Sequence, residues 1–291
     1  MVFFYIILFL FGLGFGSFLN VVSLRFKPEN QVFDFKKIGG RSACPHCRKT
    51  LRWYELIPIV SFFVQAGKCR SCKHKLSWRY PIVEILGGLI FVAVPFLTTP
   101  NYQSLIFNYQ LIGFWLVWIF ALLILLLIAL IDLKHYLIPD ELTWLLILWG
   151  VILLILKSLT PNYTFFEQSF LRHFSLLLMW SNDIWFNHLF GALAATVFFG
   201  SLFYFGKGKI LGGGDVKLGF ALGLLLGWPD ILMALMLTFL LGGAVGLILM
   251  LNRKKTMKDF LPLAPFLAIS VGLTVLFGYQ IINGYFALVG L

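Results

Sequence analysis

Leu211-Gly212-Gly213-Gly214-Asp215-Val216-Lys217-Leu218 decides how the rest of the chain is interpreted, because an acidic residue follows three glycines between long apolar runs. An ionisable residue at the edge of a membrane span is costly and therefore indicates function. Glycines allow another backbone to approach closely, so a loop of Gly212, Gly213 and Gly214 would let a substrate strand reach the Asp215 carboxylate. The alternative is a helix start in which Asp215 is the N-cap after a flexible turn.

The composition is that of a polytopic membrane protein. Of 291 residues, 60% are hydrophobic and only 12% are charged, which excludes a soluble domain with one core. We therefore expect an all-α membrane protein with about eight transmembrane helices. They are predicted at residues 1–22, 82–98, 111–131, 142–157, 187–205, 216–227, 231–251 and 263–289. The sixth is shorter than the roughly 20 residues that a bilayer requires, so we expect it to begin inside a protein-lined cavity.

The first apolar segment is expected to be retained as a helix. It has no basic n-region and no convincing cleavage site, so it does not match a signal peptide. Its small residues Gly12, Gly14, Gly16 and Ser17 predict a face for close helix packing. Asn20 is expected to make an interhelical hydrogen bond, and a catalytic role is the alternative.

Residues 23–80 are the one sizeable polar segment, and we expect a small cytoplasmic domain here, followed by a membrane domain over residues 81–291. The segment contains two CxxC pairs separated by twenty-one residues: Cys44, Cys47, Cys69 and Cys72. This spacing predicts a tetrahedral structural zinc site with four thiolate ligands, whose metal supplies folding energy. His46 and His74 are expected to be neighbours of the metal site. The alternatives are two disulfides or free thiols, and a cytoplasmic location disfavours disulfides.

The basic residues predict the orientation in the membrane. Of 23 Lys and Arg, all but Lys157 and Arg172 lie in four stretches: 23–80, 132–140, 206–217 and 252–259. We therefore expect the N-terminus outside and these four stretches in the cytoplasm. Residues 158–186 would form an outer loop to which no function is assigned. Because the charge follows topology, anionic lipids are the expected partners, and nucleic acid is not.

Two acidic residues are predicted at the same cytoplasmic edge. Asp132 ends the third predicted helix, and Asp215 follows the glycines. Two carboxylates at matching depth are what an aspartic protease needs, since like charges close together share one proton. One carboxylate activates a water, and the other donates to the scissile carbonyl. Asp140 is the competing candidate, but its position between Pro139 and Glu141 suits a helix N-cap.

Several motifs occur in a fixed order along nearly the whole chain. They are Gly16–Val22, the paired CxxC motifs, Glu55–Ser61, Ser77–Glu84, Ile131–Asp140, Gly212–Leu218 and Pro262–Leu267. In these motifs the chain resembles the type IV prepilin peptidases, which are aspartic proteases of the GxGD kind. The last motif continues into Ala268-Ile-Ser, where the family commonly has a glycine.

The resemblance implies a multi-pass enzyme of the bacterial inner membrane whose active site faces the cytoplasm. It implies removal of the short basic leader of prepilins or pseudopilins after a glycine, with Asp132 and Asp215 as the catalytic pair. It also implies N-methylation of the new N-terminal amine with S-adenosylmethionine, since the family links the four cysteines to the bifunctional form. The substrate's cleavage site would then unwind over the glycines.

The methyl-transfer site is weakly marked in the sequence, which has no Rossmann glycine fingerprint. Glu84 and the following Gly87-Gly88 are the candidates, and an ion pair with an arginine such as Arg79 is the alternative role for Glu84. Lys217 is expected either to hold the aspartate pair ionised or to contact a lipid phosphate.

Other functions are open at this point. A preflagellin or presenilin-like peptidase would share the GxGD aspartate, but the zinc segment argues against both. A transporter would use Asp132 and Asp215 as a proton or cation relay, although transporters often have repeated halves and midplane sites. A zinc-bearing membrane scaffold would use neither aspartate. Asp215→Asn separates these possibilities, because it abolishes cleavage in a protease, ion flux in a transporter and nothing in a scaffold.

Overall fold

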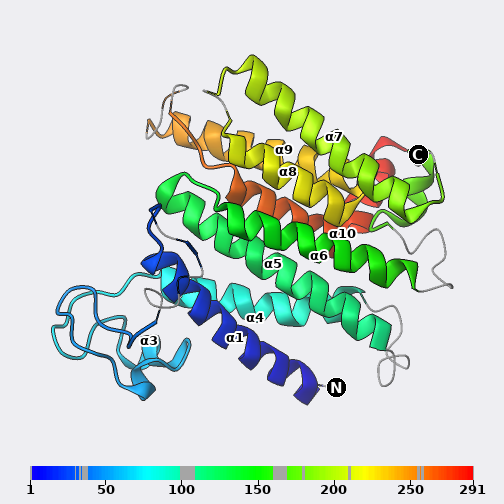
Figure 1. Cartoon of the computed structure of the whole chain (residues 1–291). Coiled ribbons are helices and arrows are strands. Elements are labelled where there is room, and N and C mark those ends of the chain that lie inside the picture. Colours follow the sequence, from blue (N-terminus) through cyan, green and yellow to red (C-terminus); the bar gives the residue numbers. More distant parts are fainter. Residues whose placement is uncertain are drawn as a thin grey trace. The chain divides into compact units, whose positions relative to one another are not determined.

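In the part of the chain that the computed structural model describes, the named elements are all helices, and two isolated β-bridges, Ala43–Thr50 and Lys68–Lys75, lie in the cysteine segment. The structure describes residues 2–29, 31–32, 34, 39–98, 109–159, 169–178, 181–208, 211–253, 256 and 259–290. The long helices are α1 (Val2–Arg25), α4 (Arg79–Thr98), α5 (Tyr109–His135), α6 (Asp140–Ser158), α7 (Ile184–Phe205), α8 (Gly213–Leu226), α9 (Asp230–Leu251) and α10 (Ala264–Val289) (Figure 1). The short ones are η1 (Trp53–Glu55), α3 (Val60–Val64) and η4 (Arg172–Leu177).

Seven of these helices are long and apolar enough to cross a membrane, which confirms the expected all-α multi-pass class. The remaining helix, α8, corresponds to the sixth predicted span. It has 14 residues and is therefore about 21 Å long. That length falls short of a hydrocarbon core about 30 Å thick. The shortness of this helix was expected, but its start was placed too late, at residue 216. It begins at Gly213, because two of the glycines form its first turn.

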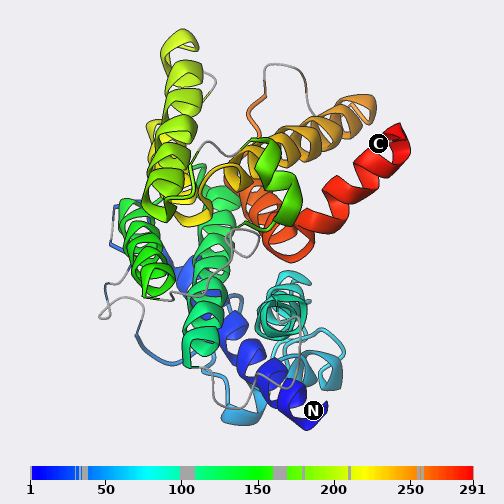
Figure 2. The same cartoon turned by 90° about the vertical axis from the view of Figure 1, so that its right-hand side faces the viewer.

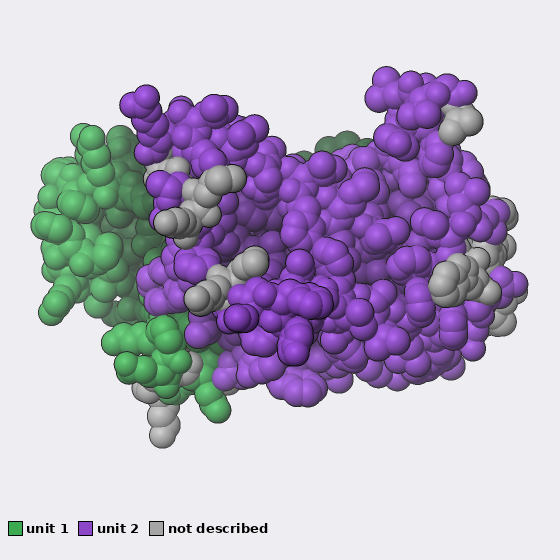
Figure 3. Space-filling view, turned by 90° about the horizontal axis from the view of Figure 1, so that it is seen from above, with its two compact units in different colours: residues 1–100 green, residues 101–291 purple. Residues whose placement is uncertain are grey.

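The chain divides into two compact units, residues 1–100 and residues 101–291 (Figure 3). Part of the expected topology lies outside the described residues. This applies to residues 99–108, 160–168 and 179–180 and to six of the basic residues used for orientation: Lys36, Lys37, Lys209, Lys254, Lys255 and Lys258.

In the first unit, α1 packs along α4 through small residues. A Cβ on Gly16 would lie 2.6 Å from the Val83 carbonyl oxygen, and one on Gly87 would lie 2.9 Å from the Gly16 Cα, so both positions require glycine. Gly12 is equally close to Gly87, whereas Gly14 faces open space and does not belong to this face.

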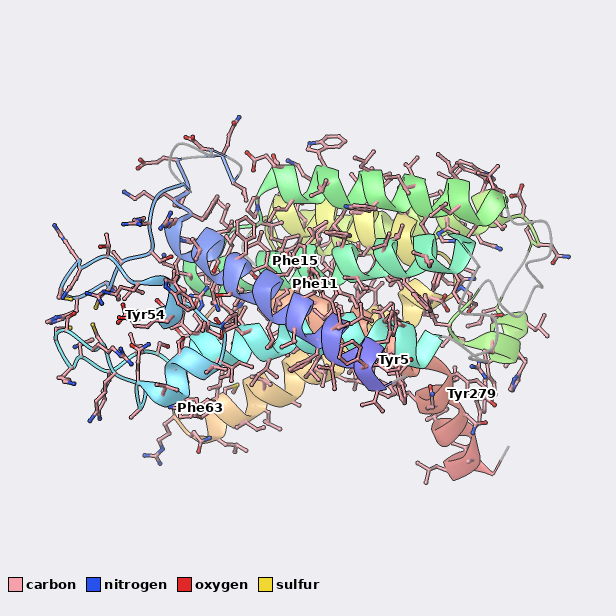
Figure 4. All side chains as sticks on the ribbon, turned by 90° about the horizontal axis from the view of Figure 1, so that it is seen from below. Tyr5, Phe11, Phe15, Tyr54, Phe63 and Tyr279 are labelled. Carbon is pink, nitrogen blue, oxygen red and sulfur yellow. The ribbon has the colours of Figure 1, made fainter. Side chains whose placement is uncertain are left out.

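Side chains at the two ends of α1 extend this contact. Asn20 Nδ2 donates to the Tyr80 carbonyl at 3.2 Å, which confirms the expected interhelical hydrogen bond. Farther along the helix, the Phe15 ring lies 5.3 Å from the Phe91 ring, and Tyr5 meets Phe96 edge-on (Figure 4). The polar group and the aromatic contacts together fix the register of the helix pair.

In the second unit, α8 is enclosed by its neighbours. It packs against α6 and α7, while α5 packs against α6 and α10 (Figure 1, Figure 2). Leu218, Leu222 and Leu225 of α8 are fully buried. A helix that is apolar on all faces is stable only when other elements surround it. The burial of α8 among its neighbours therefore explains how a helix too short to span the bilayer is stable among the membrane helices.

Candidate active site

Asp132 lies near the end of α5, one turn before the last helical residue, His135. Its side chain is buried, with 6% of its surface exposed. One carboxylate oxygen accepts a hydrogen bond at 3.0 Å from the backbone N–H of Ala264, the first residue of α10. A helix N-terminus offers unpaired N–H groups and positive potential, so α10 holds and orients this carboxylate.

Asp215 lies in the first turn of α8. Its carboxylate accepts a hydrogen bond from the Gly212 N–H at 2.9 Å. The N-cap is Gly212, so the alternative role of Asp215 as the N-cap is wrong. The side chain instead reaches back from the third helical position, as the acidic member of a capping box does. Asp132 and Asp215 lie close enough for their like charges to interact.

The three glycines before Asp215 differ in their surroundings. A Cβ on Gly213 would meet nothing within 4 Å, whereas one on Gly214 would lie 3.1 Å from the Ile138 Cβ. Gly213 and Gly214 are helical and do not form a loop. Only Gly212 and Gly213 therefore leave backbone open to an approaching chain, and Gly214 is required by the close approach of Ile138.

Asp140 and Lys217 form an ion pair at the same edge. The Lys217 Nζ donates to both oxygens of Asp140 at 2.8 Å, and each side chain is 57% exposed. Pro139 occupies the N-cap of α6, so Asp140 is the first helical residue and not the cap as expected. The described partner of Lys217 is thus Asp140 and not the aspartate pair. The ion pair ties the start of α8 to the start of α6.

The four cysteines of the first unit converge on one point. The sulfur atoms of Cys44, Cys47, Cys69 and Cys72 all lie within 4.8 Å of one another, and none forms a disulfide. The Cys44 and Cys72 sulfurs are 3.9 Å apart, close to the separation of about 3.8 Å that tetrahedral zinc with Zn–S bonds of 2.3 Å gives. These residues therefore fit a metal ion.

The two CxxC turns have the same backbone hydrogen bonds. The Cys44 N–H donates to Lys49, and the Cys69 N–H donates to His74 at the equivalent position. Backbone N–H groups of Cys72 and Ser71 lower the pKa of the Cys69 thiol to about 7, which favours the thiolate form that a metal binds.

The histidines near this cluster contact each other. The rings of His46 and His74 stack with their centroids 4.4 Å apart. The four sulfurs already supply a full tetrahedral shell. This arrangement fits the expectation that the two histidines are neighbours of the metal site.

Comparison with known proteins agrees with this geometry. A family described as "Bacterial Peptidase A24 N-terminal domain" matches residues 10–98, and one described as "Type IV leader peptidase family" matches residues 119–247. A prepilin leader peptidase/N-methyltransferase of Aeromonas hydrophila is 32% identical over 96% of this chain and 92% of its own. The chain belongs to the type IV leader peptidase family. Enzymes with the same name from Bacillus subtilis, 32% identical over 96% of both chains, and Pseudomonas aeruginosa, 31% identical over 97% and 93%, agree. No solved structure gives a significant match.

In this member of the type IV leader peptidase family, the candidate methyl-transfer residues contact other parts of the first unit. Glu84 Oε2 accepts a hydrogen bond from the Ile59 N–H at 2.7 Å, at a residue whose φ is +62°. Arg79, the expected ion-pair partner, donates to Ser23 Oγ at 2.9 Å. Gly87 packs against α1, so the Gly87-Gly88 pair has a packing role that accounts for its glycines.

Two site residues of this leader peptidase family member were not singled out from the sequence. They are Ala264, whose N–H binds Asp132, and Ile138, which packs on Gly214. Pro265 offered a signal for the first, since proline favours the first turn of a helix and so locates free N–H groups near residue 264. The contact of Ile138 depends on tertiary packing, and no local pattern predicts it.

Proposed function

We propose that the chain is a membrane aspartic endopeptidase that removes the leader of prepilins or pseudopilins and N-methylates the new terminus. The geometry of one edge of the second unit carries this proposal: Ile138, six residues after Asp132, packs on Gly214, the residue before Asp215, so the two carboxylates lie at the same edge. The relatives named prepilin leader peptidase/N-methyltransferase align with nearly the whole chain. The alternative transporter and scaffold functions lack support of this kind.

The aspartate pair would act as a unit that holds one proton. The ionised carboxylate takes a proton from a water while the water oxygen attacks the scissile carbonyl carbon. The protonated carboxyl gives its proton to the carbonyl oxygen, which forms a tetrahedral diol. On collapse, the C–N bond breaks, the leaving nitrogen takes a proton from the first carboxyl, and one diol hydroxyl gives its proton to the second carboxylate. The pair then holds one proton again, and the new carboxylic acid ionises in water. The products are a leader with a new carboxylate and a mature chain with a free amine.

The substrate backbone would pass over Gly213, where the helix surface is open. Ala264 and Gly212 would keep the two carboxylates oriented through their N–H groups. The Lys217–Asp140 ion pair at the same edge neutralises a lysine that would otherwise repel a basic leader. The bias of basic residues supports a cytoplasmic active site, with anionic lipids as partners of the exposed lysines and arginines.

The cysteine cluster would hold zinc in a structural role, because four thiolates leave no open coordination position for catalysis. S-adenosylmethionine, when bound, supplies the methyl group that the new N-terminal amine takes up. Glu84 would serve this step by holding the Ile59 turn in place, and its part in methyl transfer stays a prediction.

The test is leader removal by the purified enzyme in lipid, followed by product mass with and without S-adenosylmethionine. We expect Asp132→Asn and Asp215→Asn each to lower kcat by at least about 1000-fold, because each removes a member of the pair. Asp140→Asn is the comparison variant, since it changes an exposed acid at the same edge. We expect its kcat within about threefold of wild type and a higher KM for a basic leader, because Lys217 is then no longer neutralised. Full activity of either dyad variant would refute the assignment. A mass gain of one methyl group with the donor would support the second activity.

A further inference from the structure

A buried polar cluster lies at the ends of α6, α7 and α9 that are remote from the aspartate pair. Lys157 is 3% exposed, His188 4% and Asp230 1%. Ionisable side chains are almost never this buried unless they are paired, and within membrane segments they indicate function. Neither the proposed proteolysis nor the metal site uses them.

Hydrogen bonding assigns the tautomer of His188. Lys157 Nζ lies 3.2 Å from His188 Nε2, and His188 Nδ1 lies 2.8 Å from the Leu224 carbonyl oxygen. An ammonium group is only a donor and a carbonyl is only an acceptor. Nε2 therefore accepts from Lys157, and Nδ1 carries the proton that it donates to Leu224. Lys157 thus fixes the orientation of the ring that holds α8.

The bond to Leu224 matters because α8 is short. A helix leaves its last four carbonyls without intrahelical partners, and in a membrane each of them needs a partner from the protein. The Leu224 carbonyl is among these four, and His188 satisfies it. A full-length span is anchored by residues at both interfaces. With 14 residues, α8 is too short for this, so its position along its axis depends on protein contacts.

The neighbouring contacts between α7 and the C-terminal end of α8 also hold α8 in place along its axis. A Cβ on Gly191 would lie 2.9 Å from the Gly223 carbonyl oxygen, so the two backbones are in direct contact. The Trp228 N–H, just beyond α8, donates to the Asn187 carbonyl at 2.9 Å. Through these contacts α7 packs directly against the C-terminal end of α8, which is the end remote from Asp215.

We propose that His188, oriented by Lys157, is a positioning residue that fixes α8 along its axis and thereby sets the position of Asp215 relative to Asp132. The proposal rests on the protease function proposed above. A rigid helix transmits an axial shift along its whole length, and a misplacement of about 1 Å at a reacting group can reduce catalysis about 100-fold. His188 touches neither substrate nor reacting atoms in this scheme.

Asp230 provides a control within the same cluster. Its carboxylate accepts hydrogen bonds from Ser169 Oγ at 2.6 Å and from the Phe170 N–H at 3.1 Å. These contacts hold the segment 169–178 against α9 and do not involve α8. Asp230 also lies near enough to Lys157 for their charges to interact. Loss of the Asp230 charge should therefore weaken the fold and affect Asp215 only through Lys157.

The first measurement is kcat and KM of leader removal for four variants. We expect His188→Leu to lower kcat by about 10- to 100-fold with KM within about twofold. His188→Asn keeps an N–H donor near the position of Nδ1 and should recover most of the loss. Lys157→Met should be intermediate, because the ring loses its orienting donor. Asp230→Asn should lower the melting temperature and reduce kcat no more than Lys157→Met does.

The second measurement does not depend on cleavage. A cysteine introduced as Gly213→Cys, at the open start of α8, is labelled with a membrane-impermeant maleimide and followed by peptide mass in the wild-type and His188 backgrounds. We expect the labelling rate to change at least about threefold with His188→Leu and to be unchanged with His188→Asn.

Equal labelling in all three backgrounds would overturn the positioning role even if no prepilin were cleaved. An equal loss of kcat in His188→Leu, His188→Asn and Asp230→Asn would show that the cluster is only structural. Cleavage that fails in wild type while labelling shifts as expected would refute the protease function and retain the positioning of α8.

Discussion

At the scale of single residues, the three glycines before Asp215 have three different physical roles. Gly212 is extended, caps α8 and donates its N–H to the Asp215 carboxylate. Gly213 leaves backbone open, and Gly214 accommodates Ile138 at close range. In consecutive positions, the motif therefore has one residue that hydrogen-bonds the carboxylate (Gly212), one that leaves the backbone accessible (Gly213) and one that allows close packing (Gly214).

Replacing Gly213 and Gly214 by alanine should separate opening from packing. Gly213→Ala adds a methyl group to open space, so we expect no loss of stability and a reduction of about tenfold in kcat/KM if substrate passes there. Gly214→Ala crowds Ile138, so it should lower the free energy of unfolding by about 1–3 kcal/mol. Thermal unfolding and leader removal measured on both variants check this, and unchanged kcat/KM in Gly213→Ala would exclude the substrate path over this residue.

Sequence reasoning identified Asp132, Asp215 and the four cysteines because their signals are local: charges in apolar runs and a fixed CxxC spacing. It did not identify Ala264 or the Ile59 contact of Glu84, because both depend on segments distant in sequence. The partner of Lys217 was also unexpected, since Asp140 is 77 residues away.

At the scale of elements, hydropathy predicted the seven spanning helices of the described chain, because a bilayer imposes length and apolarity on each span. It also predicted the shorter α8. The start of α8 was placed too late because glycines usually indicate a loop. The first turn of a helix, however, has no i−4 hydrogen bonds to lose, and Asp215 stabilises that turn through the Gly212 N–H. Packing through Gly12 and Gly16 was expected, but the outward position of Gly14 follows from helix geometry that a list of small residues does not contain.

The contact between α1 and α4 offers a matched pair of variants. Gly12→Leu would force a side chain into the Gly87 backbone, whereas Gly14→Leu would project into open space. We expect Gly12→Leu to destabilise the first unit by at least about 1–3 kcal/mol and Gly14→Leu to change stability by less than about 0.5 kcal/mol. Thermal unfolding in one detergent decides this, and equal midpoints for the two variants would refute the packing role of Gly12.

The cysteine cluster predicts a metal-dependent element. The purified protein should contain about one zinc per chain, and Cys47→Ser with Cys72→Ser should lose it, because two thiolates cannot complete the tetrahedral shell. Metal analysis together with limited proteolysis of residues 42–76 provides the measurement. Resistance of this segment to protease after complete zinc removal would contradict a structural metal, and Asp215→Asn should bind zinc like the wild type.

At the scale of the whole molecule, the two compact units correspond to the two family matches. The N-terminal match covers residues 10–98 of the first unit, and the leader peptidase match covers residues 119–247 of the second. The cysteine cluster belongs to the first unit. Both aspartates, and the hydrogen bond from His188 to the Leu224 carbonyl of α8, belong to the second. The cysteine cluster and the proposed protease site are therefore each built from residues of one unit.

This division predicts that the two activities can be separated. Asp215→Asn should abolish leader removal and leave methylation of an already cleaved pilin within about twofold of wild type, because Asp215 and its bond to Gly212 belong to the second unit, whereas Glu84 and the cysteines belong to the first. Cys47→Ser should have the larger effect on methylation, since it perturbs the unit in which Glu84 holds Ile59. Methyl incorporation from labelled S-adenosylmethionine into full-length and precleaved substrates measures both steps. If Asp215→Asn lost methylation of the precleaved substrate as well, the two chemistries would share one site, and the methyl acceptor would have to be sought beside the aspartates and not in the first unit.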